Sequence, residues 1–476
     1  MQTKFMLRSG AAVGVLIAAM STAPAALADA TTDVGPATVT LGGFLAMETL
    51  YRSRDEGADI GSTFSGIPFP STSTAHTSEL RFSARQSRLS ILAQGNADSD
   101  THLAFYGEFD FMAGPGSANS NESNSYSPRI RNVYGTVDWD AEGVELLAGQ
   151  NWSLLTLNSH GITPRNEVPP ATIDAQYSVG FNWARQPQIR IVKNWDHQVW
   201  VAVSVENPQT TFAGAPGNGT ATGVTVVDSI AGSSEFDKTV NVLSLNHVPD
   251  VIGKVAWEPQ FGDSQPLHIE AFGIYRSFYD RTEITAANTQ GLPAGNTNFN
   301  ESGGGVGGSI AYSVIPKTLD LQITAMTGSG IGRYGSGQLP DVTIRPNGTL
   351  APIQETTALF GATWHVTPML DLYTYAGQEA ELPKYFNVGT THLGIGNPAV
   401  VNTGCATELG SCSVNIQAEN QINGGFWWRI YQGKFGSFRF GGQYSYTKLI
   451  SFAGSTGAHA PTDDSMFFTS IRYYPF

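Results

Sequence analysis

The stretch that decides the fold is His102–Met112, HLAFYGEFDFM. One parity carries Leu103, Phe105, Gly107, Phe109 and Phe111; the other carries His102, Ala104, Tyr106, Glu108 and Asp110. This alternation is typical of a strand with two unlike faces. In a soluble sandwich the apolar face packs on a core, whereas in a membrane barrel it faces lipid and the polar face lines a lumen. The stretch has the roughly 9 to 11 residues with which a tilted strand crosses a bilayer.

The N-terminus has the features of a secretory signal peptide. Lys4 and Arg8 precede the apolar run Ala11–Met20, and Ala26-Leu27-Ala28 offers the small residues that a signal peptidase reads. A membrane anchor is the alternative, but the run is about half the length of a spanning helix. The sequence therefore predicts a signal peptide over 1–28, whose removal takes two positive charges and changes the net charge from -14 to -16.

The composition predicts an all-β chain. It contains 53 glycines and 11% aromatic residues, with frequent alternation and no run of 18 apolar residues. No linker or composition break divides it, so a short segment over 29–38 is followed by a single barrel domain over 39–476. The acidic balance, with scattered Lys and Arg, gives no indication of nucleic-acid binding.

The connections between alternating runs fall into two length classes. Seven short polar ones lie at 96–100, 140–143, 194–196, 260–265, 315–317, 367–368 and 432–436. Eight long ones lie at 53–78, 113–128, 153–186, 207–249, 280–302, 328–355, 380–419 and 451–464. These connections join about sixteen strands, with both termini on the short-turn side, which is the arrangement of a bacterial outer-membrane barrel.

Individual strands support this interpretation unevenly. The runs 198–206, 319–325 and 438–444 alternate clearly, whereas 39–51 is mixed and 176–182 fits either strand or loop. The run 80–94 carries arginines on both parities and requires a bulge for all of them to face a lumen. Aromatic residues flank the short turns as an interfacial girdle does: Trp139, Trp195, Trp257, Phe261, Trp364, Tyr431 and Phe435. The terminal Phe476 fits the closing strand of such a barrel, with Pro475 at the strand's extreme end.

Five strings in chain order resemble the DcaP-like porins: FSARQSRL (82–89), LAGQNWS (147–153), RQPQIR (185–190), GIGRYG (330–335) and FRFGGQYSY (438–446). The match as a whole extends from about Leu41 to Phe476. The resemblance implies a trimeric outer-membrane channel associated with the uptake of small dicarboxylic acids. Family members can carry a helical extension before the barrel, and here only about ten residues precede the first strand, so no function of that extension is carried over.

Two motifs have an ordinary structural interpretation. Gly330–Gly335 satisfies G-x-G-x-x-G, but Ser336, Gly337 and Pro340 follow instead of a helix, so it is read as a loop and no cofactor is expected. Cys405 and Cys412 lie in one long connection of an exported chain, where a disulfide is favoured over free thiols or a metal pair. We expect this bridge to staple a loop tip and to matter little to the barrel.

Catalytic motifs are absent from the sequence, and no enzyme activity is predicted. His160 in the third long connection could serve a nearby Ser or Asp, so a barrel hydrolase stays an alternative. A secreted soluble glycan-binding β-protein is a second alternative. Neither is favoured by a motif.

Arginines on strands and on the third long connection carry the functional hypothesis. An Arg facing the bilayer centre costs about 2 to 4 kcal/mol, so these side chains are expected in the lumen, where some pair with acids to hold the wall. The connection 153–186 is expected to fold inward as a constriction, because a sixteen-stranded barrel is otherwise wide. The predicted pore-lining residues are Arg85, Arg88, Arg131, Arg165, Arg190, Glu108, Asp110 and Glu167.

The resulting interpretation is a porin in the outer membrane of a Gram-negative bacterium. It would pass small solutes passively and prefer anions. The planar guanidinium group of Arg matches a carboxylate, and the charges that line the narrowest section decide selectivity more than the net charge of the chain does. If Glu108, Asp110 and Glu167 dominated instead, the pore would favour cations or be indifferent. Expected partners are small anionic solutes, outer-membrane lipid and lipopolysaccharide, the outer-membrane assembly machinery, and two further copies in a homotrimer.

Overall fold

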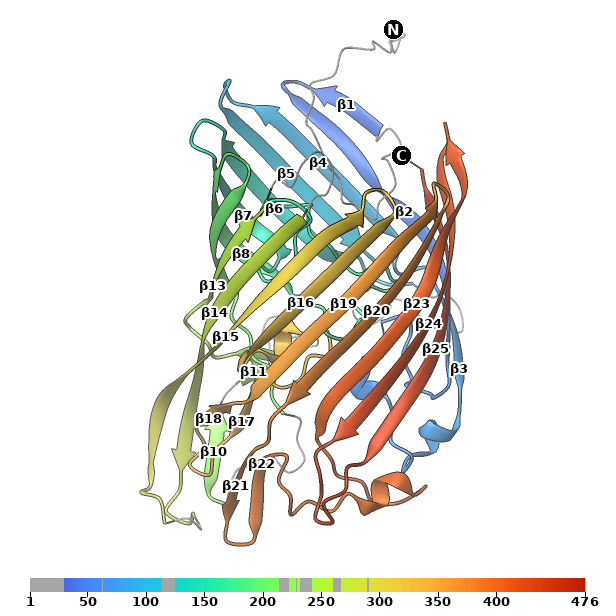
Figure 1. Cartoon of the computed structure of the whole chain (residues 1–476). Helices are drawn as coiled ribbons and strands as arrows, with labels where there is room; N and C mark the ends of the chain where they lie inside the picture. Colours follow the sequence, from blue (N-terminus) through green and yellow to red (C-terminus); the bar gives the residue numbers. More distant parts are fainter. Residues whose placement is uncertain are drawn as a thin grey trace.

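The computed structural model describes residues 30–61, 63–113, 125–213, 222–227, 229–231, 242–259, 267–288 and 291–475. The chain forms a closed antiparallel barrel of sixteen strands, as the sequence predicted (Figure 1). Each barrel strand pairs with its neighbour in the chain, and β2 (Ala37–Arg52) pairs with β25 (Pro461–Tyr474) to close the sheet. Closure leaves no strand edge exposed to lipid.

The remaining barrel strands follow in chain order: β3 (Glu79–Ser83) continuing into β4 (Arg88–Asn96), β5 (Thr101–Asp110), β6 (Arg129–Trp139), β7 (Val144–Trp152), β8 (Arg185–Trp195), β9 (Val199–Glu206), β13 (Asp250–Trp257), β14 (Leu267–Ile284), β15 (Gly295–Ile315), β16 (Leu319–Ser329), β19 (Gln354–Thr367), β20 (Leu370–Glu381), β23 (Ile416–Gly433) and β24 (Gly436–Ser451).

Shorter elements belong to the connections. The short strands are β1 (Ala30–Val34), β10 (Val224–Val227), β11 (Ser229–Ala231), β12 (Val242–Ser244), β17 (Val342–Ile344), β18 (Leu350–Pro352), β21 (Lys384–Val388) and β22 (Thr391–Ile395). The 3-10 turns are η1 (Phe64–Gly66), η2 (Ser73–His76), η3 (Gly332–Tyr334) and η4 (Thr403–Ala406). None of the helices in the described ranges has the length and apolar character needed to span a membrane.

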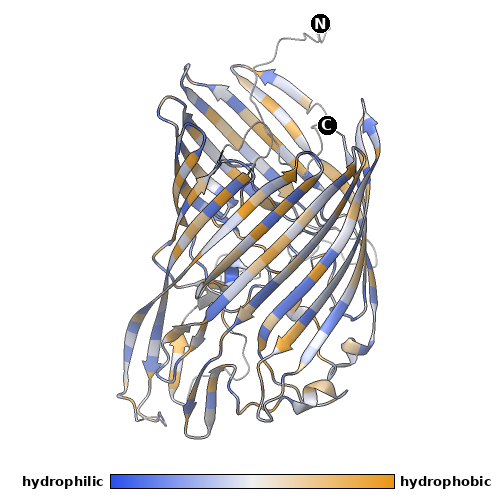
Figure 2. Ribbon diagram, viewed as in Figure 1, coloured by the Kyte–Doolittle hydropathy of each residue, from blue (hydrophilic) through white to orange (hydrophobic). Residues whose placement is uncertain are grey.

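The lipid-facing alternation is clear on β5 and β9. Leu103, Phe105 and Phe109 are exposed on the outside of β5, while Asp110 is buried on the inside. On β9, Val203 is exposed and its neighbours Ala202 and Ser204 are buried. Figure 2 shows the result as alternating blue and orange bands along the strands. The polar side chains of each strand face the lumen, as a membrane barrel requires. Segments of the loops fill part of this lumen.

The arginine-rich run 80–94 contains the interruption that the sequence required. β2 pairs with β3 through Glu48 and Ser83, and with β4 through Phe44 and Arg88. The four residues between the two strands therefore face only three on β2, which is the effect of a bulge. The extra residue switches which alternate side chains face the lumen. Arginines before and after the bulge can therefore both point inward.

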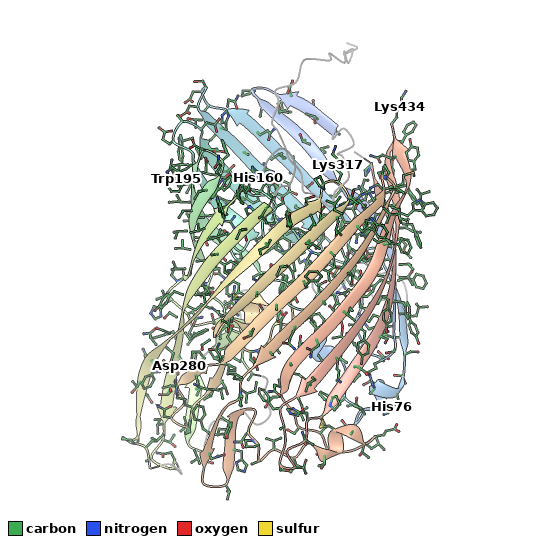
Figure 3. The ribbon with its side chains drawn as sticks, in the orientation of Figure 1. His76, His160, Trp195, Asp280, Lys317 and Lys434 are labelled. Atoms are coloured by element: carbon green, nitrogen blue, oxygen red, sulfur yellow. A yellow bond between two sulfur atoms is a disulfide. The ribbon has the colours of Figure 1, made fainter. Side chains whose placement is uncertain are left out.

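The short turns gather at one end of the barrel and the long connections at the other. Trp195, Lys317 and Lys434, which lie at three short turns, are near the upper end in Figure 3, and His76 and Asp280 lie lower. By the general rule for such barrels the short-turn end is periplasmic. Several aromatic residues beside these turns are exposed on the surface, as a girdle is: Trp195, Trp257, Trp364, Tyr431 and Phe435. Phe261 and residues 1–28 lie outside the described residues.

One long connection was predicted wrongly. The range 280–302 was expected to be loop, but β14 continues to Ile284 and β15 begins at Gly295. The hairpin pairs residue by residue from Leu267 opposite Tyr312 out to Ile284 opposite Gly295. Its outer part is mainly polar because it extends beyond the bilayer, so the ladder continues where the hydrophobic alternation stops. The first strand also begins at Ala37, two residues before the expected 39, and the run 176–182 is loop.

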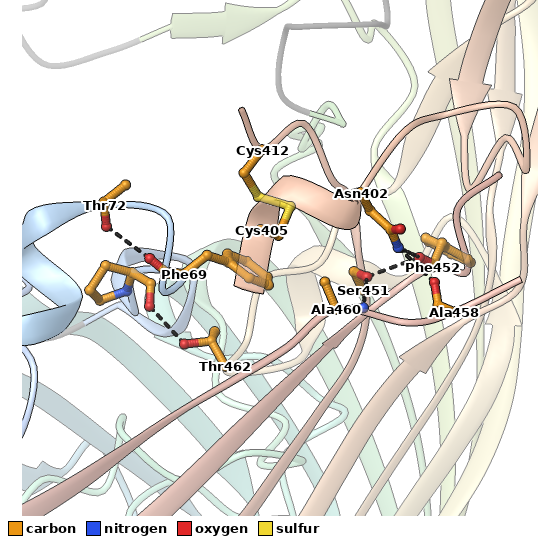
Figure 4. Close-up of a disulfide and its surroundings, with 11 residues drawn as sticks. Phe69, Thr72, Asn402, Cys405, Cys412, Ser451, Phe452, Ala458, Ala460 and Thr462 are labelled. Atoms are coloured by element: carbon orange, nitrogen blue, oxygen red, sulfur yellow. Dashed lines mark hydrogen bonds between the residues drawn. A yellow bond between two sulfur atoms is a disulfide. The ribbon is translucent and has the colours of Figure 1, made fainter. Parts of the chain in front are cut away.

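Cys405 and Cys412 form a disulfide in the connection 382–415. Cys405 is fully buried, so the bridge is not at an exposed loop tip as expected. The Cys405 carbonyl accepts a hydrogen bond of 3.1 Å from the Ser71 amide, and the Leu409 amide donates to the Ser71 carbonyl at 3.0 Å. The bridged segment therefore folds back onto the first long connection, and Figure 4 shows both beside the Ser451–Ala460 turn.

Candidate functional site

A group of arginines lies on the inner wall formed by β4, β5 and β6. Arg131 donates from Nε to Glu108 at 2.6 Å and from Nη1 to Asp110 at 3.0 Å. Arg129 binds the same Asp110 with two donors, at 3.0 and 2.8 Å. Arg88 lies 3.7 Å from Glu108. Period-2 alternation points both carboxylates of β5 into the lumen. A register shift opposite them on β6 lets Arg129 and Arg131 also point into the lumen.

Two further arginines extend this group, which we call the basic patch: Arg85, Arg88, Arg129, Arg131 and Arg185. Arg85 lies 3.3 Å from Asp59 and donates to the Phe111 and Ala113 carbonyls. Arg185, the first residue of β8, stacks over Trp152 at 4.9 Å and lies within electrostatic reach of Arg129 and Arg131. Five guanidinium groups thus surround three carboxylates, those of Asp59, Glu108 and Asp110.

Some donors of the basic patch lack a protein acceptor. Arg88 Nε, Arg185 Nε and Arg185 Nη1 are buried and have no hydrogen-bond partner among the described residues. The side chains of Arg88 and Arg129 are nevertheless 29% and 28% exposed, so water reaches this wall. Buried donors normally have partners. The unfilled donors are therefore where an anion with several acceptor oxygens would bind.

The connection 153–184, which we call loop 3, folds into the lumen and crosses it. Near its start, the Thr156 carbonyl accepts from Lys254 of β13 at 2.7 Å, and the Asn158 amide donates to Glu270 of β14 at 3.0 Å. Near its end, the Ile173 amide donates to Gln443 of β24 at 2.7 Å. Contacts with strands far apart around the barrel hold the loop across the channel, where it narrows the opening.

Arg165 and Glu167 lie in the middle of loop 3 and face the wall beside the basic patch. Arg165, in the left-handed region at φ 71°, donates from Nη1 to the Tyr134 hydroxyl at 3.4 Å. Glu167 accepts a bond of 3.0 Å from Asn151 Nδ2. Burial raises the pKa of Glu167, and the Arg190 charge opposes that rise. This part of loop 3 thus places a basic side chain, Arg165, and an acidic side chain, Glu167, next to the wall of β5–β7.

Arg190 differs from the other residues predicted to line the pore. It is only 1% exposed, and it donates to Gln188 at 3.1 Å and to the Trp152 carbonyl at 2.7 Å. Loop 3 covers Arg190, so in this structure Arg190 stabilises the barrel wall through these hydrogen bonds. The structure therefore brings together Arg85, Arg88, Arg131, Glu108 and Asp110 and places Arg165 and Glu167 nearby. Arg190 lies apart from the basic patch, within electrostatic reach of Glu167.

A second inward segment escaped the sequence analysis. Residues 330–353, which we call loop 6, are anchored by Arg276, whose Nη1 donates to the Gly330 carbonyl at 2.5 Å and to Asp341 at 2.6 Å. The hydroxyl of Tyr334 donates to Asp250 at 2.7 Å, and Arg333 contacts Gln186. Loop 6 therefore narrows the lumen together with loop 3. The family-like string 330–335 marked this segment in the sequence. That the segment folds inward depends on partners far away in the chain, which the string does not show.

Four buried glutamates, which we call the carboxylate band, lie behind loops 3 and 6: Glu355, Glu379, Glu381 and Glu419. In the strand register Glu355 is opposite Glu381, and Glu379 is opposite Glu419. Glu379 accepts from the Gly180 amide at 2.7 Å and from the Gly337 amide at 3.1 Å. Both oxygens of each of the other three lack a hydrogen-bond partner in the described part of the chain. Sequence reasoning missed this band because its members come from three strands.

The barrel is similar to solved outer-membrane channels. The outer-membrane channel DcaP of Acinetobacter baumannii superposes with a TM-score of 0.62 at 16% identity over 93% of this chain and 98% of that chain. An anion-selective porin from Comamonas acidovorans gives 0.47 at 12% identity, over 92% and 99%. Salmonella typhi OmpF gives 0.48 at 9% identity, over 93% and 99%. The likeness to DcaP, at 16% identity, establishes the fold, and the DcaP-like resemblance read from the sequence agrees with it.

Comparison of the sequence with protein-family models gave no match. Comparison with curated proteins gave none either.

Proposed function

We propose that the protein is an outer-membrane porin that lets small anionic solutes, dicarboxylates among them, diffuse passively. The observation that carries this proposal is the set of unfilled guanidinium donors at Arg88 and Arg185 on a water-accessible wall opposite an inward loop. Arg offers a planar fork that binds a carboxylate with two bonds. Donors spaced along a wall would pass a dicarboxylate onward without holding it tightly.

The charge of the lining outweighs the negative charge of the chain. Exposed loop charges more than a Debye length away, about 8 Å at physiological salt, are screened from the constriction. Glu108 and Asp110 are already bound by Arg129 and Arg131, so they attract passing cations weakly. The proposed channel sits in the outer membrane of a Gram-negative bacterium, among lipid and lipopolysaccharide, is inserted by the assembly machinery, and works as a homotrimer.

The hydrolase alternative receives no support from the geometry at His160. Its Nδ1 lies 2.6 Å from Glu258, and the neighbouring Ser159 hydroxyl donates to the Asn166 carbonyl at 3.2 Å rather than to the imidazole. A serine nucleophile needs its base within hydrogen-bond reach. A channel is therefore the function that the geometry supports best.

Reversal potentials in a tenfold potassium chloride gradient across a planar bilayer test the proposal. We expect the wild type to prefer chloride, and the double substitution Arg88→Gln and Arg185→Gln to lower the chloride-to-potassium permeability ratio by about twofold or more. Arg281→Gln, in the outer part of the β14–β15 hairpin, is the control and should leave the ratio unchanged. A cation-selective wild type, or a double variant with unchanged preference, would overturn the proposal.

A further inference from the structure

A cavity of about 480 Å³ lies between loop 3 and the wall of β6–β9 at the short-turn end of the barrel. Its chemistry comes from six of its lining residues: Asp138, Asp140, Glu145, His160, His197 and Trp200. Figure 3 shows His160 near that end of the barrel. The side chain of Asp140 is 64% exposed, so the cavity opens to water on the periplasmic side. The volume is in the range of about 300 to 1,000 Å³ that small-molecule sites occupy.

The cavity is strongly acidic. Asp138 of β6 lies directly opposite Glu145 of β7 in the strand register, and like charges in that position destabilise a sheet. Asp140 adds a third carboxylate, and no Lys or Arg is among the lining residues. Glu145 Oε1 is buried and has no hydrogen-bond partner in the described part of the chain. A buried unpaired acceptor is costly, so this wall favours a ligand that brings positive charge and donors.

Asp138 and Glu145 form no hydrogen bond or ion pair with a described residue, so the nearby cations act on them only at longer range. His160 is bound to Glu258 at 2.6 Å, and His102 is bound to Asp140 at 2.8 Å. Two arginines lie within electrostatic reach of Glu145, but Arg165 donates to Tyr134 and Arg190 to the Trp152 carbonyl. The Glu258 carboxylate also accepts from the Gly161 amide, at 2.6 Å.

We propose that this acidic cavity binds the ammonium group of small organic amines. An ammonium group brings three donors and one positive charge, which suits the free oxygen of Glu145 and its opposite neighbour Asp138. The rings of His160 and Trp200, 5.4 Å apart, form a wall against which the carbon chain of an amine packs, and an indole also attracts a cation. In the described residues no three acidic or histidine side chains are arranged as metal ligands, which favours an organic cation over a metal ion.

This site is separate from the basic patch and does not depend on the proposed anion preference. The basic patch lies toward the ends of β4–β6 that join the long connections, and the cavity lies at the opposite ends of β6 and β7. A solute moving along this wall would meet guanidinium groups first and carboxylates last. The two sites thus recognise opposite charges at successive levels of one channel.

Block of single-channel current by 1,5-diaminopentane tests the proposal on the full-length protein in a planar bilayer. The amine added on the periplasmic side should reduce the current, and Asp138→Asn with Glu145→Gln should raise the half-blocking concentration about tenfold. Glu142→Gln is the matched control, because Glu142 is an exposed acid on the same turn outside the cavity lining. If the double variant fails to assemble, Asp140→Asn at the exposed mouth should still raise that concentration about threefold.

Three results would overturn the proposal. These are an unchanged half-blocking concentration in the cavity variants, an equal shift in Glu142→Gln, and equal block of the wild type by magnesium at the same concentration. Reversal potentials of the same channels report the basic patch separately. A wild type that prefers cations but loses amine block in the cavity variants would contradict the proposed anion preference and support the amine site.

Discussion

Two walls of the barrel hold buried carboxylates in opposite ways. On β4–β6, Glu108 and Asp110 are bound by arginines at 2.6 to 3.0 Å. On β19–β23, Glu355, Glu381 and Glu419 are more deeply buried than Glu108, yet their oxygens have no hydrogen-bond partner among the described residues. The first wall is reached by water at Arg88, whereas loops 3 and 6 cover the second. On these two walls, the acids are therefore paired where water reaches them and left without hydrogen bonds where loops pack on them.

The largest expected effect comes from removing Arg131, the arginine that binds both carboxylates of the first wall. Arg131→Ala leaves Glu108 and Asp110 with less compensation in a buried site. Breaking a buried pair from one side costs about 3 to 5 kcal/mol, so the free energy of unfolding should fall by that order. Heat-modifiable gel migration and thermal unfolding in detergent measure it. Arg281→Ala, in the outer part of the β14–β15 hairpin, is the control. An equal loss of unfolding free energy in both variants would contradict the view that Arg131 stabilises the barrel by binding buried carboxylates.

The strands were predictable because a bilayer imposes a strict alternation. On 102–110 and 198–206 every second side chain faces lipid, and one misplaced charge is costly. The β14–β15 hairpin was missed beyond residue 280 because that constraint ends where the strands extend beyond the bilayer. Backbone pairing continues there without a hydrophobic signature, so sequence reasoning read it as loop.

The residues of the lumen wall were predictable only in part. The inward direction of Arg88 and Arg131 could be predicted because an arginine on a membrane strand must point inward. Arg190 obeys the same rule but is covered by loop 3, which no local pattern reveals. The inward fold of loop 6 depends on Arg276, which is more than fifty residues away in the sequence. The carboxylate band depends on register between three strands, so no single run of sequence contains it.

A second prediction extends the contrast to a buried carboxylate outside the strands that has a charged neighbour but accepts no hydrogen bond from the described residues. Glu56, in the connection 53–78, lies 3.6 Å from Arg52, and neither of its oxygens has a hydrogen-bond partner in the described part of the chain. Burial raises the pKa of Glu56 to about 8, with Arg52 opposing that rise. Because the folded pKa is above the unfolded value near 4.5, the protonated form favours docking. The stabilisation is fully present below pH 4.5 and is lost as the pH rises through 8.

Docking of this connection should therefore weaken between pH 5 and pH 9, by at most about 4 kcal/mol. Hydrogen exchange of amides in 53–78 measures it. Glu56→Gln should flatten the pH dependence, and Asp98→Asn, at an exposed short turn, is the control. A wild-type connection that docks more tightly at pH 9 than at pH 5 would show that Glu56 is paired after all.

The smallest effect, and the sharpest comparison with Arg131, is expected in the carboxylate band. Glu419 lies opposite Glu379, and a Cβ built on Gly337 would be 2.2 Å from Glu419 Oε2 and 2.8 Å from Glu379 Oε2. The two acids therefore meet around one glycine of loop 6, where neither finds an arginine. Glu419→Gln removes like-charge repulsion and supplies donors to the neighbouring carboxylate, so it should raise the free energy of unfolding by about 1 kcal/mol.

Thermal unfolding in detergent measures this gain, with Glu408→Gln in the connection 382–415 as the exposed control. The sign of the change is the decisive result. A buried carboxylate that belongs to an ion pair destabilises when neutralised, because its partner is then left alone. A loss of 3 kcal/mol or more in Glu419→Gln would mean that the band is held by positive charge, as the wall of β4–β6 is, and the contrast between the two walls would not hold.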